Sequence, residues 1–362
     1  MDALITPSNW QKVRLGDILS YEQPTKFLVA TTQYLQKGFT PILTAGKTFI
    51  LGYTNDKHGI YTNIPVIIFD DFTTDSKMVN FPFKVKSSAI KILSLRDNNQ
   101  ADLKYIYEKL TLLKHQVTDH KRYWIDEFSN IEILLPPLNE QIAIANILSG
   151  VDRYLYSLDA LILKKESVKK ALSFELLSQR KRLKGFNQTW QRVRLGDIAN
   201  YLTSNLSVEQ ITQQGKIKVY DVNNFIGYTD TTFISDKPYI SIVKDGSVGR
   251  VRILPPKTNI LSTMGALIAN HKTTTEFLFY LLSNFDFKNF TSGSIIPHIY
   301  FKDYKEKTIF LPPLNEQIAI ANILSGLDHE IISLKNKKRQ FENIKKALNH
   351  DLMSAKIRVL NK

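Results

Sequence analysis

The sequence predicts an α+β protein built from two similar halves, each with a globular domain of mixed sheet and helices followed by a long helix. Two internal repeats predict this. The sixteen residues LPPLNEQIAIANILSG occur at 135–150 and again at 311–326. A second motif occurs as WQKVRLGDI at 10–18 and as WQRVRLGDI at 190–198. The copies are 176 and 180 positions apart, about half of the 362 residues, so we predict two domains related by a pseudo-two-fold axis.

Each half opens on the tryptophan-containing motif and continues into a stretch that differs between the halves. Val13, Leu15 and Ile18 predict a short strand with a turn inside it. The stretches that follow, 19–134 and 199–310, are similar in length but not in sequence. Short apolar and aromatic runs separated by Asp, Asn, Gly and Pro predict strands of a mixed sheet in both.

Within these stretches the patterns predict individual elements. In the first half we expect strands at 66–72 and within 78–93, and a helix at 102–115. In the second half we expect a hairpin over 239–254, turning at Asp245 and Gly246, and a helix near 275–284.

The sixteen-residue repeat predicts the start of a long helix. A pair of prolines suits the turn before a helix or its first positions. Asn139 and Asn315 then fall where an N-cap belongs, and the glutamate after each places negative charge at the positive end of the helix dipole. We predict helices over 139–180 and 315–356, each about 63 Å long if continuous.

The apolar spacing in these helices predicts a seam for another helix, because steps of three and four recur over several turns. The economical arrangement is an antiparallel coiled coil of the two helices. Two alternatives remain: each helix packs on its own domain as an ordinary hairpin, or both pair with another subunit. The residues expected in the seam are Leu148, Val151, Leu155, Leu158, Ile162, Leu324, Leu327, Ile331, Leu334 and Phe341.

These elements divide the chain into four regions. A globular domain precedes each repeated region, and each repeated region forms a long spacer helix. The predicted boundaries are 1–134 for the first domain, 135–184 for the first repeated region, 185–310 for the second domain and 311–362 for the second repeated region.

The composition limits the class of protein. There is no cysteine, which excludes disulfides and cysteine-ligated metal sites. The sequence shows no signal peptide and no apolar run of membrane-spanning length, so we expect a cytoplasmic protein. The formal net charge of +14 favours a polyanionic partner, and nucleic acid is preferred over a membrane because no amphipathic, aromatic-anchored helix is present. A merely soluble basic protein is the alternative.

A search for catalytic motifs finds little. The stretch AGKT at 45–48 resembles the end of a phosphate loop, but Pro41 stands where the first glycine belongs. Asp70, Asp71 and Asp75 form an acidic cluster directly after a strand, which suits a polar turn at least as well as a nuclease site. The histidines show no metal-binding spacing. We therefore expect no catalytic, cofactor or metal site in this chain.

Binding residues are expected among the cations and aromatics of the two domains. Arginine and lysine position a protein on phosphates, and polar groups that face a groove read bases. The candidates for contact with DNA are Lys47, Lys57, Lys77, Lys84, Lys86 and Lys91 in the first half, and Lys244, Arg250, Arg252, His298, Tyr300 and Lys302 in the second.

The two repeated motifs together resemble those of the specificity subunit of type I restriction–modification systems. W-x-x-V-x-L-G-D-I opens each half and LPPLNEQIAIANILSG closes each domain, and the likeness extends over essentially the whole chain. Looser likenesses to target-recognition domains lie at 69–93 and 291–299.

The resemblance implies a function. Each domain would be a target-recognition domain that reads one half of a bipartite sequence in double-stranded DNA. The paired helices would set the gap and dock methyltransferase subunits, which carry S-adenosylmethionine; translocase–nuclease subunits would complete a restriction complex. The chain itself would be non-catalytic. A free-standing DNA-binding regulator and a self-contained methyltransferase are the alternatives.

Overall fold

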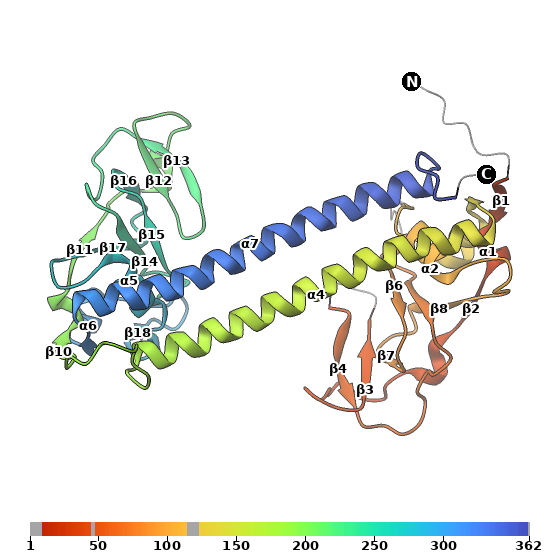
Figure 1. Ribbon diagram of the computed structural model, residues 1–362, viewed down its shortest axis with the longest axis horizontal. Coiled ribbons are helices and arrows are strands. Elements are labelled where there is room, and N and C mark those ends of the chain that lie inside the picture. Colours follow the sequence, from red (N-terminus) through yellow and green to blue (C-terminus); the bar gives the residue numbers. More distant parts are fainter. Residues whose placement is uncertain (1–8, 45–47, 114–122, 361–362) are drawn as a thin grey trace. The chain divides into compact units, whose positions relative to one another are not determined.

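The computed structural model describes residues 9–44, 48–113 and 123–360. The chain divides into two compact units, which we call the first unit (Met1–Asp159 with Lys337–Lys362) and the second unit (Ala160–Asn336). Two helices of 40 residues, α4 (Leu138–Leu177) and α7 (Leu314–Met353), each contribute residues to both units (Figure 1).

The first unit contains three small sheets and short helices. The strand orders are β2-β8-β5-β6, β4-β3-β7 and β1-β9. The strands are β1 (Gln11–Arg14), β2 (Leu19–Glu22), β3 (Thr40–Leu43), β4 (Ile50–Thr54), β5 (Val66–Asp70), β6 (Ser76–Val79), β7 (Lys84–Val85), β8 (Ile90–Leu95) and β9 (Glu132–Leu135). The short helices are α1 (Leu15–Ile18), α2 (Leu103–Leu110) and α3 (Tyr123–Asp126), with 3-10 turns η1 (Pro24–Phe27) and η2 (Phe128–Asn130).

The second unit repeats this topology with a different sequence. Its strand orders are β11-β17-β14-β15, β13-β12-β16 and β10-β20, with an added β18-β19 pair. The strands are β10 (Gln191–Arg194), β11 (Ala199–Thr203), β12 (Ile217–Tyr220), β13 (Phe225–Thr229), β14 (Tyr239–Val243), β15 (Val251–Leu254), β16 (Thr258–Ile260), β17 (Met264–Ala269), β18 (Thr291–Ser292), β19 (His298–Ile299) and β20 (Thr308–Leu311). Its helices are α5 (Thr275–Ser283) and α6 (Phe301–Tyr304), with 3-10 turns η3 (Leu195–Asp197), η4 (Val208–Gln210) and η5 (Lys288–Phe290).

The predicted α+β class is therefore confirmed, and so are most of the expected elements. β5, the β14–β15 hairpin and α5 lie where the patterns place them. The strand predicted from Val13, Leu15 and Ile18 is wrong in its second part: β1 ends at Arg14 and α1 follows. Leu15 and Ile18 are both buried three residues apart, which is the spacing of one helical turn.

The helix predicted at 102–115 is shorter in the structure. The side chain of Asp102 caps α2 by accepting from the amide of Tyr105 at 2.8 Å, and the helix ends at Leu110. The last two residues of the predicted range lie outside the described part of the chain. This region therefore forms a helix of eight residues rather than fourteen.

The long helices begin slightly earlier than predicted. The carbonyl of Pro137 already accepts from the amide of Gln141 at 3.0 Å, so α4 begins before Asn139. Asn139 is therefore not the N-cap, although its Oδ1 accepts from the amide of Glu140 at 2.9 Å and satisfies one first-turn donor. The second copy shows the same correction, with Pro313, Asn315, Glu316 and Gln317 in the matching places.

Each long helix ends three residues before the predicted end, at Leu177 and Met353, and a residue in the left-handed region follows two positions later. Gln179 has φ 65° and Ala355 has φ 59°, and the two positions correspond in the repeat. Such backbone cannot continue a right-handed helix.

The repeated motifs meet in three dimensions. In the first unit β1 pairs antiparallel with β9, which leads into α4. Trp10 Nε1 donates to Glu140 Oε2 at 3.3 Å, and Arg358 Nε donates to Glu140 Oε1 at 2.8 Å. Glu140 is 2% exposed, so this carboxylate is held by an indole and a guanidinium.

The second unit contains the same arrangement. Trp190 Nε1 donates to Glu316 Oε2 at 2.9 Å, and Arg182 Nη2 lies 2.6 Å from the same oxygen. Each arginine follows the long helix of the opposite repeat: Arg182 lies just beyond α4 and Arg358 just beyond α7. The repeats are therefore reciprocal, because each domain is closed by the helix end that the other repeat supplies.

The glutamine of the repeated stretch joins the long helix to the start of the domain's own helix. Gln141 Oε1 accepts from the amide of Asp102, and its Nε2 donates to the carbonyls of Gln100 and Pro136 at 3.1 and 2.8 Å. Gln317 makes the same bonds in the second unit, to the amide of Thr274 and the carbonyls of Lys272 and Pro312. Both side chains are fully buried.

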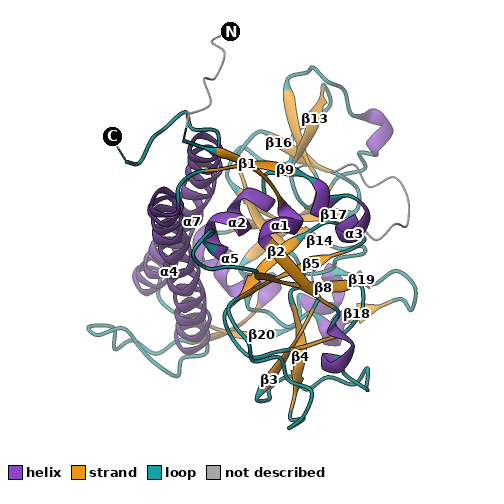
Figure 2. Cartoon of the chain, turned by 90° about the vertical axis from the view of Figure 1, so that its right-hand side faces the viewer, coloured by secondary structure: helices purple, strands orange, loops and turns teal. Residues whose placement is uncertain are grey.

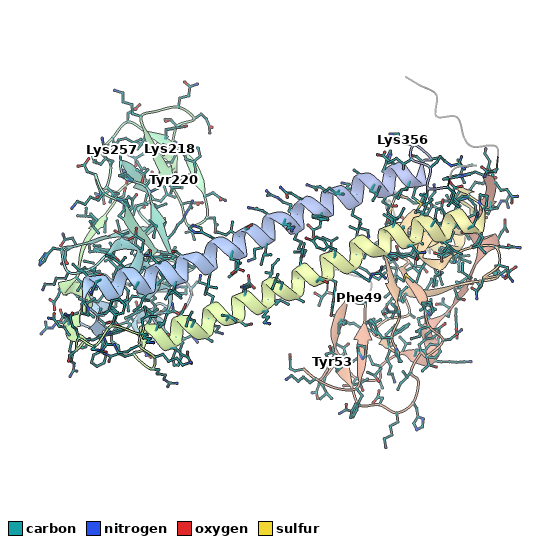
Figure 3. All side chains as sticks on the ribbon, viewed as in Figure 1. Phe49, Tyr53, Lys218, Tyr220, Lys257 and Lys356 are labelled. Atoms are coloured by element: carbon teal, nitrogen blue, oxygen red, sulfur yellow. The ribbon has the colours of Figure 1, made fainter. Side chains whose placement is uncertain are left out.

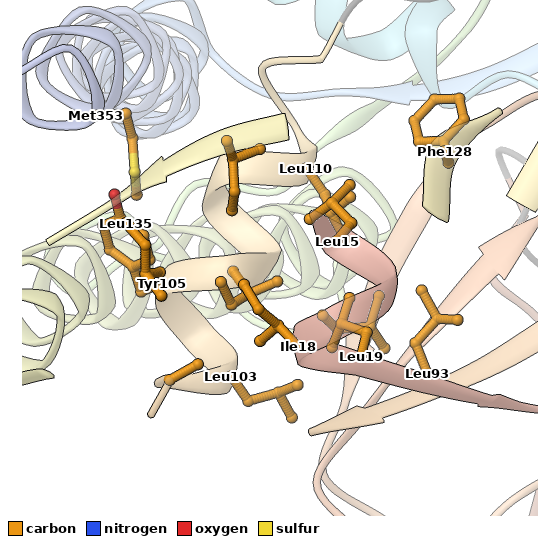
Figure 4. Packing of buried hydrophobic residues seen from close by; sticks show 14 of the residues in the cluster. Leu15, Ile18, Leu19, Leu93, Leu103, Tyr105, Leu110, Phe128, Leu135 and Met353 are labelled. Carbon is orange, nitrogen blue, oxygen red and sulfur yellow. The ribbon is translucent and has the colours of Figure 1, made fainter. Parts of the chain in front are cut away.

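The core of each unit combines sheet and helix residues. In the first unit Leu15, Leu93 and Tyr105 pack with Met353 from the end of α7 (Figure 4). In the second unit the corresponding cluster includes Leu176 of α4 and Leu324 of α7. Within the described residues, no helix is long and apolar enough to span a membrane.

α4 and α7 lie side by side and antiparallel within each unit (Figures 1 and 2). In the first unit Asp152 pairs with Lys345 at 2.7 Å and Asp159 pairs with Lys338 at 2.7 Å, so α7 numbers fall as α4 numbers rise. In the second unit Glu166 pairs with Lys335 at 2.6 Å, and Lys169 pairs with Asp328. The expected antiparallel pairing is confirmed in both units.

The predicted seam residues are more buried than the helix surface around them. Leu158, Ile162 and Ile331 are 5 to 6% exposed. Leu148 and Leu324 are fully buried in the clusters that also contain sheet residues, so they anchor the helices to the domains. The remaining five are half-buried: Val151, Leu155, Leu327, Leu334 and Phe341.

Candidate nucleic-acid interface

Four of the predicted contacts come together in the second unit. Lys244 follows β14, His298 lies on β19, and Tyr300 and Lys302 lie at the start of α6. The amide of Ile299 donates to the carbonyl of Lys244 at 2.9 Å, which joins these segments. Residues more than fifty positions apart thus form one surface region.

A short hydrogen-bond network stiffens this region. His298 Nδ1 lies 2.7 Å from Asp245 Oδ1, and the amide of Gly246 donates to the carbonyl of Pro297 at 2.9 Å. Gly246 has φ 82°, which permits the tight turn after Asp245. The loop between β14 and β15 is therefore fastened to β19.

The same surface region contains a shallow cationic hollow. Its lining includes Tyr201, Lys244, Tyr300, Lys302 and Lys305. Lys302 Nζ lies 5.6 Å from the ring centroid of Tyr300, which is half-exposed. Three ammonium groups beside an exposed aromatic ring suit a phosphate backbone with an adjacent base or sugar. Lys305, which directly follows α6, was not among the predicted residues, because its local sequence does not show where its side chain lies.

Arginine 252 lies on a different surface of the second unit. Its guanidinium lies 5.2 Å from the centroid of the Tyr220 ring and donates to the carbonyl of Asn223 at 3.0 Å. Lys218 lies on the same strand, β12, as Tyr220, and Lys257 directly precedes β16, which pairs with β12 (Figure 3); neither lysine was predicted. The β13-β12-β16 sheet therefore carries a second basic and aromatic surface, and Arg250 is exposed in the loop before β15.

Two predicted contacts in the first unit are corrected by their burial. Lys91 is 1% exposed, with its ammonium 2.7 Å from the carboxylate of Asp71. Lys84 is 6% exposed, with its ammonium 3.0 Å from Asp56 and 3.1 Å from the carbonyl of His58. Both lysine side chains are buried and held by these acceptors, so neither is available to DNA. Breaking the contact costs more for Lys91, because Asp71 is buried, whereas the Asp56 side chain is 49% exposed.

The other first-unit candidates remain predictions. Lys57 and Lys86 are exposed, and Lys77 on β6 is half-buried. Lys47 lies outside the described residues. The sequence therefore overestimated the number of cations available in the first unit.

The acidic cluster of the first unit is structural. Asp70 Oδ1 accepts from the amides of Phe72 and Thr73 at 2.8 and 3.2 Å, which forms the turn after β5. Asp71 accepts from the amide of Trp124 at 3.0 Å and pairs with Lys91. Among the described residues no group of acidic and histidine side chains is arranged to hold a metal ion.

One face of the repeated stretch is exposed to solvent. Glu140, Gln141 and Leu148 are buried against the domain. The opposite face carries Asn139, Ile142, Asn146 and Ile147, whose spacing places them on one side of the helix. Ile142 and Ile147 are 42% and 39% exposed.

The second copy presents the same face. Ile318 and Ile323 are 49% and 38% exposed, with Asn315 and Asn322 exposed beside them. We call these two sets of residues the repeat faces. Burial accounts for the identity of the buried residues, and the bond to the next amide accounts for Asn139 and Asn315. Burial does not account for the exposed isoleucines of the repeat faces.

Comparison with known proteins identifies a family. A family model described as type I restriction modification DNA specificity domain matches residues 7–165 and again residues 187–343. The EcoR124I/EcoR124II type I restriction enzyme specificity subunit of Escherichia coli is 50% identical over 152 residues. That match covers 41% of this chain and only 37% of the relative.

Other relatives match along the full length. The MjaVIII type I restriction enzyme specificity subunit of Methanocaldococcus jannaschii is 25% identical, covering 100% of this chain and 96% of the relative. The crystal structure of the S subunit of a type I restriction–modification system from M. genitalium has a TM-score of 0.65 at 20% identity. It covers 96% of this chain and 97% of its own, and it shows the same fold.

Proposed function

Since the chain belongs to the type I restriction–modification DNA specificity family, we propose that it selects the DNA target of a methyltransferase complex. Each unit contains one copy of the family's domain, and the two copies have the same topology but different surface residues. Each domain reads one half of a bipartite sequence in double-stranded DNA. The proposal rests on one observation: the two domains share one topology but differ in their surface residues.

Binding through two domains of one chain makes the second contact intramolecular. Its effective concentration is then far above that of a free domain, so two modest half-site affinities combine into a tight one. The net charge of +14 adds the sequence-independent attraction to phosphates that every DNA reader needs.

The repeat faces are the docking sites for two methyltransferase subunits. They are identical, exposed and present once in each unit, so one kind of partner fits both. Half-exposed isoleucines flanked by asparagines give an apolar centre with polar edges, as at protein–protein interfaces. The methyltransferase supplies S-adenosylmethionine and the chemistry, and translocase–nuclease subunits complete the restriction complex. This chain acts without a catalytic site of its own.

Methylome sequencing of cells with and without this chain tests the function. We expect a bipartite adenine-modified motif that disappears when the chain is deleted. A gel shift with and without the methyltransferase subunit distinguishes an adaptor from a free-standing regulator, because a regulator binds its site equally well alone. An unchanged methylome, with tight site-specific binding by the isolated chain, contradicts the proposal.

A double variant tests the docking sites. Ile142→Asp with Ile318→Asp places a charge in the centre of each repeat face, and we expect co-purification of the methyltransferase to be lost. Leu163→Asp is the matched control, because Leu163 is 64% exposed on α4 but corresponds to Arg339 in the other repeat. Normal assembly of the double variant would place the docking surface elsewhere.

A further inference from the structure

The loop between β18 and β19 carries two isoleucines in an exposed position. Ile295 is 92% exposed and Ile296 is 54% exposed. We call residues 293–297 the isoleucine loop. Large aliphatic side chains that stay exposed at the tip of a folded loop do not gain the free energy of burial, so contact with an apolar group would be favourable.

The isoleucine loop is braced on both sides. Ser292 pairs with His298 in the β18–β19 ladder, and His298 is fastened to Asp245 at 2.7 Å. Gly293 has φ 90°, and a Cβ there would lie 2.2 Å from the carbonyl oxygen of Ile296. Only glycine fits this position, so the turn that presents the isoleucines is specified by the sequence.

Several cations lie on the segments next to the loop, where Asp245 is the acidic residue that contacts His298. Lys244 is joined to β19 by the bond from the Ile299 amide, and Lys302 and Lys305 line the hollow that includes Ile299 and Tyr300. Arg250 is exposed in the loop that starts at Lys244. An apolar tip with cations nearby is complementary to a surface with an apolar group close to anions.

The major groove of DNA presents such a surface. The C5-methyl group of thymine is the apolar group on its base edges, and phosphates border the groove. Resting on the proposed function, we infer that Ile295 and Ile296 read thymine by contact with its methyl group. The cations hold the phosphates on either side, and the isoleucine loop is a specificity determinant of the second domain.

Replacement of thymine by deoxyuridine tests this inference, because it removes the methyl group and leaves pairing unchanged. The complex of the full chain with its methyltransferase subunits is titrated with duplexes that carry the mapped target, each with one thymine replaced. We expect one position, within one half-site, to lose affinity by about four-fold, the equivalent of one buried methyl group.

The double variant Ile295→Ala with Ile296→Ala should bind the thymine and deoxyuridine duplexes equally. Because both side chains are exposed, we expect an unchanged melting temperature. Val208→Ala is the matched control: Val208 is 64% exposed in the same unit, and its variant should keep the discrimination.

Three results overturn the inference: equal affinity of the native complex for every substituted duplex, full discrimination by the double variant, or a target with no A·T pair in the half-site that the second domain reads. Failure of the proposed function looks different, because the complex then shows no preference for the mapped target over a scrambled duplex.

Discussion

The same position of the helix seam is occupied by different chemistry in the two units. In the first unit the rings of Tyr154 and Phe341 are 4.6 Å apart between centroids. The repeat places Glu330 and Lys165 at the corresponding positions of the second unit, where they form an ion pair at 2.7 Å. Corresponding positions of the α4–α7 pair therefore form an aromatic contact in the first unit and a charged contact in the second.

A second pair of corresponding positions shows what stays the same. Asp152 with Lys345 in the first unit corresponds to Asp328 with Lys169 in the second. The neighbours differ: the buried Glu108 joins the first pair, whereas the hydroxyl of Tyr280 donates to Asp328 at 2.8 Å. The two long helices form the same charged pair in both units, and each domain adds a different third residue, Glu108 in the first and Tyr280 in the second.

These differences explain why α4 pairs with α7 rather than with α4 of a second copy of the chain. In a pairing of two α4 helices, Tyr154 would face Lys165, and both the aromatic and the ionic contact would be lost. Asp159 would face Glu166, without the lysine that now bridges Asp159 and Glu342. Unequal seams thus favour the pairing within one chain, since like charges and mismatched partners disfavour the alternative.

The largest expected loss of stability comes from removing the buried glutamate that each unit contains, Glu140 in the first and Glu316 in the second. Glu140→Ala leaves Arg358 and the Trp10 indole without their acceptor, and Glu316→Ala does the same to Arg182 and Trp190. Because the buried indole N–H loses its acceptor and the partly buried guanidinium loses its counter-ion, we expect a loss of about 3 kcal/mol in the free energy of unfolding for either variant. Urea denaturation followed by tryptophan fluorescence measures it. Asn146→Ala on the exposed face is the control. Equal stability of all three variants would show that the contacts of Glu140 and Glu316 do not stabilise the fold.

The next largest effect is a loss of stability that should differ between the two units. Lys345→Ala leaves the 1%-exposed Glu108 with one fewer cation, whereas Lys169→Ala removes one partner of a partly exposed carboxylate. We expect the free energy of unfolding to fall by up to about 3 kcal/mol in Lys345→Ala and by about 1 kcal/mol or less in Lys169→Ala. Thermal melting compares them, and a larger loss from Lys169→Ala would reverse the comparison.

Exchanging the seam chemistry is expected to have a smaller effect. Tyr154→Glu with Phe341→Lys gives the first unit the pair found in the second. We expect a loss of about 1–2 kcal/mol, because the aromatic contact is replaced by an ion pair that contributes little at a surface. The loss should grow in 1 M salt, which screens the new pair. A variant as stable as the native chain would mean that the seams are interchangeable.

The smallest effect is a dependence on pH in the first unit. Burial alone would raise the pKa of Asp152, but its bonds to Lys104 and Lys345 outweigh this and hold the pKa below its usual value. A lowered carboxyl pKa stabilises the fold above the unfolded value of about 3.9, and this stabilisation is lost as pH falls through the folded pKa. The melting-temperature difference between the native chain and Asp152→Asn should be constant at pH 5–7 and shrink below about pH 4. A melting-temperature difference that grows as the pH falls would contradict the lowered pKa of Asp152.

Local patterns were sufficient for the repeated elements. Prolines followed by LNEQ and a three-to-four apolar spacing predict the long helices, and the structure moves their starts by one residue and their ends by three. The binding residues were predicted less well. Lys84 and Lys91 look like any surface lysine in sequence, but they neutralise Asp56 and Asp71, which lie 28 and 20 positions away.

The sequence by itself determined that two like halves exist, where each begins, and which residues start and line the long helices, because these depend on turn chemistry and periodicity within a short window. Only the tertiary structure decided that the two dissimilar domains share one strand order, that Arg358 closes on Glu140, and that one face of the repeat is left exposed. These features rest on contacts between distant segments, whose free energy depends on burial and on the partner present, and no local pattern encodes either.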